Sequence, residues 1–225
     1  MKVYFVRHGE TDWRQLDAKG VKGWARSFAP LTPIGRAQID AIASDYRLEE
    51  VEAILCSSYA RALESAARLS RVLNKPLYVE YDLHEWLPQK DPLGSTDAET
   101  AKRAYEEFTY YTGFYPGPER RARRDPSRLP FEGDRRLDPG ERHIPPAEAR
   151  DWESLDEVRE RALRALSRYQ HLETVAVVTH AVVIASLIGV HRQIEHAEIV
   201  PLEIDLGALD ADTEAAPATP NRSLR

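Results

Sequence analysis

The chain opens on a short apolar segment that ends in charged residues. Residues 2–6 are rich in Val, Tyr and Phe, which favour strands, and they lead directly into Arg-His-Gly-Glu-Thr at 7–11. Open α/β sheets bind ligands at the carboxyl ends of their strands. We therefore expect a strand that presents His8 at a functional edge of a sheet, and segments elsewhere in the chain that bring partners to it.

Strand-like and helix-like segments alternate after this opening. Residues 52–56 and 77–79 are short runs of strand-forming residues, and between them alanines and leucines recur at helical spacing from 62 to 73. An Asn-Lys-Pro sequence at 74–76 is typical of a helix end. The alternation predicts a parallel sheet covered by helices.

The late part of the chain continues this pattern. Ser154 and Glu157 form a capping-box signature ahead of a helix. Residues 174–179 are a continuous apolar run, typical of a central strand buried on both faces, and residues 181–190 predict a buried helix. Residues 201–206 alternate as an edge strand does. The predicted fold is a three-layer α/β/α domain with a central, mostly parallel sheet.

The segments between these elements are harder to place. Residues 12–30 have no clear period and predict a loop. Thr32 and Pro33 have the character of an N-cap and a first helical residue. The apolar face of that helix is predicted from its spacing to comprise Ile34, Ala37, Ala41 and Ile42.

We expect one domain over residues 1–207, with an inserted cap region at about 87–150. The insertion is rich in Pro, Gly and Arg and has one convincing helix near 98–111. Residues 208–225 are Ala-, Pro-, Thr- and Asp-rich, which predicts a disordered tail. The aromatic residues of the insertion either line a substrate pocket or pack it onto the core: Trp86, Tyr105, Tyr110, Tyr111 and Phe114.

Composition excludes some classes of function. The 225 residues carry a net charge of −6, which argues against a general nucleic-acid binder. Nucleic-acid binding by the arginines of the insertion remains a weak alternative. These are Arg120, Arg121, Arg123, Arg124, Arg128, Arg135 and Arg136. Cys56 is the only cysteine, so no intrachain disulfide can form. No signal peptide or membrane-spanning run is visible, so we expect a cytoplasmic protein without a membrane partner.

Residues suited to phosphate chemistry follow the predicted strands. Arg7 and His8 come after the first strand, and Arg61 lies in the first turn after the second. Glu85 follows the third strand, and His180 ends the late one. Because parallel strands share one carboxyl edge, we expect these side chains to converge. Arginine can hold a phosphate with two hydrogen bonds, and histidine and glutamate can act as nucleophile and acid.

This set resembles the histidine phosphatase superfamily, the phosphoglycerate-mutase-like proteins. The likeness covers residues 1–86 and about 150–190. It is carried by Arg-His-Gly-Glu-Thr at 7–11, Pro-Leu-Thr at 30–32 with Gly35 and Gln38, Ser-Ser-Tyr-Ala-Arg-Ala at 57–62, Leu-His-Glu at 83–85, Glu-Ser at 153–154 with Val158 and Arg161, and Val-Thr-His at 178–180.

The resemblance implies a metal-independent phosphatase acting on small phosphate monoesters, without a cofactor. His8 would form a phosphohistidine, and Glu85 would be the general acid and base. Arg7, Arg61 and His180 would bind the phosphate. Two positions depart from the family pattern: Arg14 stands where Asn is usual, and Ala181 where Gly is usual. We include Arg14 as a further candidate phosphate ligand.

Several alternatives stay open at this stage. The acid could be Glu80, Asp82, His84 or Glu99 instead of Glu85. The protein could be a phosphoglycerate mutase-type phosphotransferase, although Trp-Leu-Pro at 86–88 differs from the stretch that follows the acid in glycolytic mutases. It could also be a catalytically weak binding module, and a homo-oligomer is left open. A metal site at His191, Glu195 and His196 is a weaker interpretation than a polar helix boundary.

Overall fold

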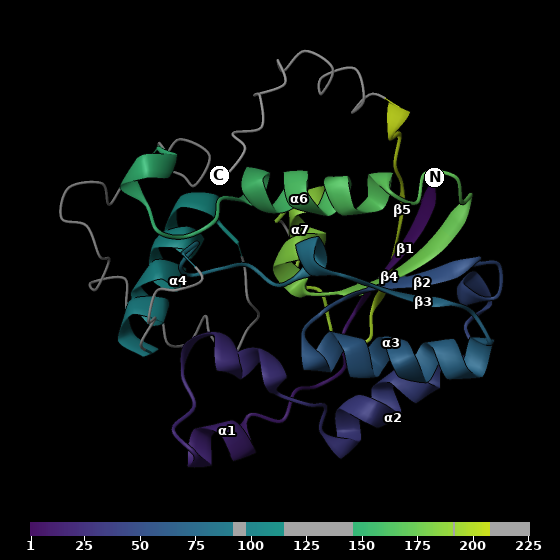
Figure 1. Ribbon diagram of the computed structural model, residues 1–225, viewed down its shortest axis with the longest axis horizontal. Helices are drawn as coiled ribbons and strands as arrows, with labels where there is room; N and C mark the ends of the chain where they lie inside the picture. The colour runs from purple at the N-terminus through teal and green to yellow at the C-terminus, as the bar shows by residue number, and fades with distance from the viewer. Residues whose placement is uncertain (92–97, 115–145, 191, 208–225) are drawn as a thin grey trace, which may run out of the picture.

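The computed structural model describes residues 1–91, 98–114, 146–190 and 192–207 (Figure 1). Within them lies a five-stranded sheet of order β3-β2-β4-β1-β5. All neighbours run parallel except β5, which pairs antiparallel with β1 at one edge. The predicted mostly parallel sheet is confirmed. The strands are β1 (Lys2–Arg7), β2 (Ala53–Ser57), β3 (Leu77–Glu80), β4 (Thr174–Thr179) and β5 (Ile199–Glu203).

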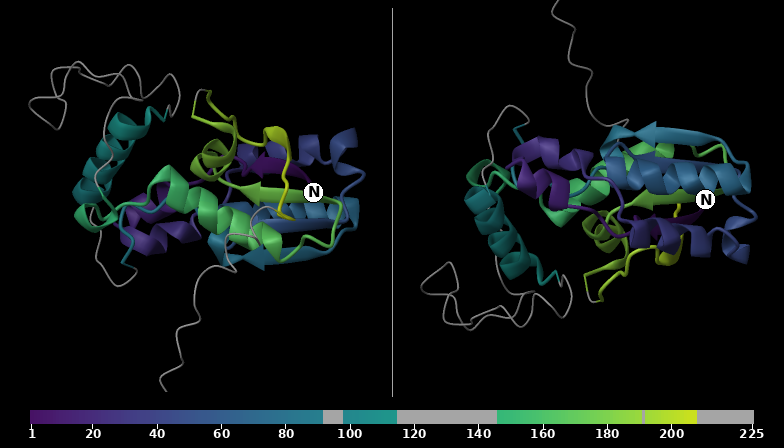
Figure 2. Two further views of the ribbon diagram at one scale, coloured as in Figure 1. Left: turned by 90° about the horizontal axis from the view of Figure 1, so that it is seen from above. Right: turned by 90° about the horizontal axis from the view of Figure 1, so that it is seen from below.

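Side chains alternate between the two faces of this sheet, so that β1, β2, β4 and β5 each contribute to two cores. Val3 and Phe5 of β1 pack into one core, whereas Tyr4 and Val6 pack into the other. Figure 2 shows helices on both faces of the strands. Burial of β4 on both faces explains why residues 174–179 are apolar without alternation. The three-layer architecture is therefore confirmed.

One face carries α2 (Pro33–Ile42) and α3 (Ala60–Leu73), and the other carries α6 (Leu155–Ser167) and α7 (Ala181–Ile188) (Figure 1). The helix α4 (Ala98–Thr112) joins the core on the α6 side through Phe108, which lies against Trp86 and Trp152. The remaining short helices are α1 (Arg14–Ala18), η1 (Gly23–Phe28), η2 (Tyr46–Leu48), η3 (Tyr81–Leu83) and η5 (Ala147–Ala149).

The predicted helix ends are confirmed. The Thr32 side chain accepts a hydrogen bond from Gly35 N at 2.8 Å, with Pro33 in the first turn of α2. Ser154 and Glu157 form the reciprocal capping box of α6. Asn74 ends α3 in the left-handed conformation, with φ of 53°. These local signals therefore place three helix boundaries correctly.

Two expectations about residues 12–42 are wrong. The predicted loop at 12–30 contains α1 and η1. The predicted apolar face of α2 is also displaced, because Ile34 is 61% exposed while Gly35 and Ile39 are buried. The helix turns Gly35 and Ile39, and not Ile34, toward the core because the backbone after β1 approaches it at Gly35.

The segment after β1 and the helix α2 approach each other closely at Gly9 and Gly35. A methyl group on Gly35 would collide with the backbone oxygen of Glu10, and one on Gly9 would collide with the backbone oxygen of Gly35. Thr32 N also donates to Glu10 O at 2.9 Å, so the first turn of α2 supports the loop that follows His8. Only residues without a Cβ allow this contact.

We expect Gly35→Ala to lower the free energy of unfolding by about 2 kcal/mol in urea titrations, because the added methyl has no room. Helix propensity alone predicts the opposite sign, a gain of about 1 kcal/mol. Gly207→Ala is the control, because its added methyl would lie 3.4 Å from Asp205 Oδ1, an ordinary contact distance. A Gly35→Ala protein as stable as wild type would contradict the packing described.

Some expectations concern residues outside the described ranges. The seven arginines of the insertion, the tail at 208–225 and His191 all fall there. Within the described ranges, no helix is both long enough and apolar enough to cross a bilayer. Cys56 is buried in β2, and burial raises the pKa of its thiol to about 12.

Candidate active site

Five of the six predicted site residues meet at the carboxyl edge of the sheet, with Arg7 as the last residue of β1. His8 follows β1, His180 follows β4, Arg61 lies in the first turn of α3, and Glu85 follows η3. The pairing of Arg7 with Thr179 brings the ends of β1 and β4 together. As a result, the rings of His8 and His180 lie 5.1 Å apart, edge to face.

His8 is held as a single tautomer. Its Nδ1–H donates to Gly9 O at 2.7 Å, and Arg61 Nε–H donates to its Nε2 at 3.1 Å. The ring is buried, and this burial together with the nearby charge of Arg61 holds its pKa well below the usual range. His8 is therefore neutral at pH 7, with the Nε2 lone pair directed at a guanidinium group.

Arg7 and Arg61 supply positive charge beside His8. Arg61 is only 6% exposed, and burial lowers the pKa of both guanidinium groups, which nevertheless stay charged at neutral pH. Among the described atoms, Arg7 Nε is buried without a hydrogen-bond partner. The site therefore contains at least one buried donor with no protein acceptor.

His196 also reaches this cluster, which the sequence did not indicate. Arg7 Nη2 donates to His196 Nε2 at 3.1 Å, and the His196 ring lies 5.6 Å from that of His8. Burial and the neighbouring Arg7 lower the pKa of His196 to about 4. Its place on the loop before β5 follows from the antiparallel pairing of β5 with β1.

His180 is fully buried at the N-cap of α7. A hydrogen bond of 2.8 Å joins its Nε2 to Ser57 Oγ, and its Nδ1 has no partner among the described atoms. Burial is the largest cause that lowers the pKa of His180, and the charge of Arg61 adds to it. Like His8, it is neutral at pH 7.

Glu85 differs from an ordinary surface carboxylate. Its Oε1 accepts a hydrogen bond from Trp86 N at 2.9 Å. Burial raises the pKa of the carboxyl group, although the charges of Arg61 and Arg7 partly oppose this shift. A carboxyl group with a raised pKa is suited to give and take a proton near neutral pH.

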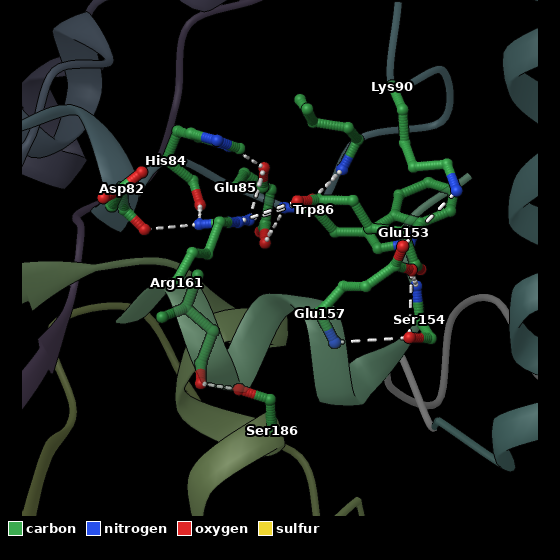
Figure 3. Close-up of polar contacts among 12 residues, drawn as sticks. Asp82, His84, Glu85, Trp86, Lys90, Glu153, Ser154, Glu157, Arg161 and Ser186 are labelled. Atoms are coloured by element: carbon green, nitrogen blue, oxygen red, sulfur yellow. Dashed lines mark hydrogen bonds and ion pairs between the residues drawn. The ribbon is translucent and has the colours of Figure 1, made fainter. Parts of the chain in front are cut away.

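A buried ion pair fixes the backbone around Glu85 (Figure 3). Arg161 pairs with Glu153 through two hydrogen bonds of 2.8 and 3.0 Å. The same guanidinium donates to three backbone oxygens of residues 82–85, which we call the acid loop: Asp82 O at 2.6 Å, His84 O at 2.7 Å and Glu85 O at 3.3 Å. Arg161 is therefore placed to set the position of the acid loop.

We expect Arg161→Met to lower the free energy of unfolding by about 3 kcal/mol, because it leaves the buried Glu153 carboxylate and three carbonyls without their donor. Arg164→Met on the same helix is the control. Its side chain is 63% exposed and pairs with Asp82 at 3.4 Å, so its loss should cost below about 1 kcal/mol. Equal losses in urea unfolding would contradict a special role for Arg161.

The other predicted candidates lie elsewhere. Arg14 is not brought to His8: its side chain is 79% exposed and pairs with Asp12 at 2.6 Å. Asp82 and Glu80 face Arg168 on α6's end, and His84 is buried with its Nδ1–H donating to Glu85 O at 2.7 Å. Glu80, Asp82, His84 and Glu99 do not line the cleft in front of Arg61, whereas Glu85 does and lies close enough for the charges of Arg61 and Arg7 to act on it, so Glu85 is the best-placed acid.

A cleft of about 570 Å³ opens in front of Arg61 and Glu85. One wall of the cleft includes residues of α1 and η1, in the stretch 12–30 for which a loop is predicted. As for metals, the described residues contain no group of three His, Cys, Asp or Glu side chains arranged as ligands. Of the suggested metal trio, His191 lies outside the described residues, and His196 contacts Arg7.

Two histidines, two arginines and a carboxyl group at one sheet edge define a site for an anionic group in an α/β protein. Residues 3–125 match the family described as histidine phosphatase superfamily (branch 1). This stretch is more than half of the 225-residue chain. The chain belongs to this superfamily.

One relative by sequence is "Probable phosphoglycerate mutase GpmB" of Photorhabdus laumondii, 31% identical over 85 residues. The match spans 38% of this chain and 38% of that protein. Solved structures share the fold over far more of the chain. Bacillus stearothermophilus YhfR is 24% identical, with 91% of both chains covered and a TM-score of 0.57. The alpha-ribazole phosphatase from Shigella flexneri is 22% identical, with 91% of both covered and a TM-score of 0.52.

Proposed function

We propose that this chain is a metal-independent phosphatase that hydrolyses small phosphate monoesters through a phosphohistidine on His8. The single observation that carries this proposal is the environment of the His8 ring. Nδ1–H donates to Gly9 O, and Nε2 faces the Arg61 guanidinium across 3.1 Å. A neutral imidazole whose free nitrogen already faces a phosphate-binding cation is suited to attack phosphorus.

The phosphate would bind between the two arginines. Arg61 would exchange its hydrogen bond to His8 for bonds to phosphate oxygens, and the unpartnered Arg7 Nε would supply another. His180 and the N-terminus of α7 would face the same oxygens. The dianion would favour protonation of His180, which burial otherwise keeps neutral. Because these cations balance the phosphate charge, the proposal requires no metal.

Two displacements at phosphorus complete the reaction. First, His8 Nε2 bonds to phosphorus, the ester P–O bond breaks, and Glu85 gives its proton to the leaving alcohol oxygen. Next, water attacks the phosphohistidine and loses a proton to Glu85, while the N–P bond breaks and phosphate leaves. Glu85 ends protonated and His8 neutral, as they began.

A mutase is the second candidate, because the sequence relative carries that name. A phosphoglycerate mutase must also hold a carboxylate and return the phosphoryl group to its substrate. The residues after Glu85 favour the phosphatase, because Trp86 and Leu87 offer no charge for a carboxylate. A binding module without activity is less favoured, because the buried charged set has no evident structural purpose.

Hydrolysis of p-nitrophenyl phosphate in the presence of a chelator tests the proposal. We expect turnover that the chelator leaves unchanged, together with an acid-labile, base-stable phosphoprotein in rapid-quench samples. Turnover that the chelator abolishes would contradict the metal-independent mechanism. Phosphoprotein formed from 2,3-bisphosphoglycerate, with conversion of 3- to 2-phosphoglycerate and little release of phosphate, would establish the mutase.

We also propose a domain organisation, a cellular location and a limited range of partners for this protein. Residues 1–207 form one domain with a cap over about 87–150, which is supported by the packing of Phe108 in α4 against Trp86 and Trp152. The protein acts in the cytoplasm, and it binds neither nucleic acid nor membrane. Its state of association is left to measurement.

A further inference from the structure

The cleft in front of Arg61 is mainly aromatic and apolar. Its lining includes four large aromatic side chains from three separate segments, together with Val21, Leu87, Pro88 and Ala101. The four aromatic residues are Trp13, Trp24, Tyr59 and Trp86. A wall of this kind gains binding energy by covering an apolar surface, and a flat ring fits it better than a hydrated chain.

The aromatic wall begins at the phosphate-binding cation itself. The Arg61 guanidinium lies 5.5 Å from the Trp13 ring centre and 5.1 Å from that of Tyr59. Trp24 and Tyr59 both border His84, at ring separations of 6.3 and 6.1 Å. A phosphate held by Arg61 would therefore place its ester group directly among these rings.

Besides Arg61 and Glu85, three charged side chains line the cleft, Asp17, Lys22 and Arg26, and the two cations among them are either paired or exposed. Arg26 pairs with Asp17 at 2.8 Å and lies over the Trp13 ring at 4.8 Å. Lys22 is exposed at the rim, where water screens its charge. The other lining residues are uncharged, apart from Arg61, which would hold the phosphate, and Glu85, which repels a second anion when ionised.

We infer that the site selects phosphate monoesters whose alcohol part is flat and apolar, such as an arylmethyl group, over those that carry a second acid group. This inference rests on the proposed phosphatase function and specifies its substrate class. The rings of Trp13, Trp24, Tyr59 and Trp86 would enclose the alcohol part, while Arg61 and Arg7 hold the phosphate.

The test compares three substrates that leave as alkyl alcohols, so that leaving-group reactivity differs little. They are 2-naphthylmethyl phosphate, ethyl phosphate and 3-phosphoglycerate. We expect kcat/KM to be at least about tenfold higher for the naphthyl ester than for either of the others. In Trp24→Ala, we expect the ratio of naphthyl to ethyl ester to fall about tenfold. A ratio measured on one preparation does not depend on how much of the variant is folded.

Phe28→Ala is the matched control, because Phe28 belongs to the same short helix as Trp24 but is 74% exposed and does not line the cleft. Its ratio should equal that of wild type. Comparable turnover of all three substrates, or an unchanged ratio in Trp24→Ala, would overturn the substrate class and leave the phosphatase intact. If wild type hydrolyses none of the three esters and no p-nitrophenyl phosphate, the proposed function itself fails.

Discussion

Replacing His8 by alanine is expected to lower kcat for p-nitrophenyl phosphate by about 10⁴-fold or more, because the covalent route is lost. Alanine has no group that can bond to phosphorus. Arg7 and Arg61 remain, so substrate binding should change far less than turnover. Steady-state kinetics in the presence of a chelator measures the loss, and rapid-quench samples should show no phosphoprotein.

His171→Ala is the control for this experiment, because His171 is an exposed histidine beside Tyr169, on the turn before β4. It should turn over substrate at the wild-type rate. If His8→Ala retained wild-type kcat, a different nucleophile would have to carry the reaction. The mechanism proposed above would then be wrong.

The second large effect is expected for Glu85→Gln, which keeps the shape of the side chain but cannot transfer a proton. We expect kcat for ethyl phosphate to fall by about 10³-fold. The loss should be smaller for p-nitrophenyl phosphate, because nitrophenolate leaves without a proton. This dependence on the leaving group distinguishes loss of the acid from a general disturbance of the site.

The pH dependence of kcat also tests the role of Glu85 as the acid. Burial raises the pKa of Glu85, so the carboxyl group stays protonated to higher pH than an ordinary glutamate. Burial lowers the pKa of His8, so the nucleophile is neutral through the same range. Wild-type kcat for ethyl phosphate should therefore decline as pH rises through the raised pKa of Glu85, and Glu85→Gln should lack this decline.

Asp82→Asn is the matched control for the acid. Asp82 lies three residues earlier, but its carboxylate pairs with Arg164 and Arg168 on the surface. We expect it to change kcat no more than about twofold. A large loss in Asp82→Asn together with a small loss in Glu85→Gln would reassign the acid.

Local patterns were enough to predict much of this molecule. The unbroken apolar run at 174–179 predicted a strand covered on both faces, and β4 is the central strand. The Ser154–Glu157 box and the Thr32 cap predicted helix starts because their hydrogen bonds join residues three apart. His8 and His180 were expected to meet because parallel strands end at one edge, and the structure shows that their strands β1 and β4 are paired neighbours.

Most of the predictions that failed concern contacts between residues far apart in the sequence, and Arg14 is the exception. The buried face of α2 is set by Gly9, which only the folded chain brings to Gly35. Arg14 was expected to face phosphate, but its neighbour Asp12 binds it instead. His196 carried no usable signal, because β5 is short and its antiparallel register against β1 decides where the histidine lies. The aromatic cleft was hidden because its wall contains the short helices α1 and η1.

The order of the strands has a consequence for synthesis of the chain on the ribosome. The strand β1 emerges first, yet both of its neighbours, β4 and β5, lie between Thr174 and Glu203. Until these strands emerge, an apolar strand has two unpaired edges, which is the kind of segment that associates with other chains. The segment that carries His8 is therefore the one left exposed longest during synthesis, and His8 and His180 can come together only after β4 has emerged.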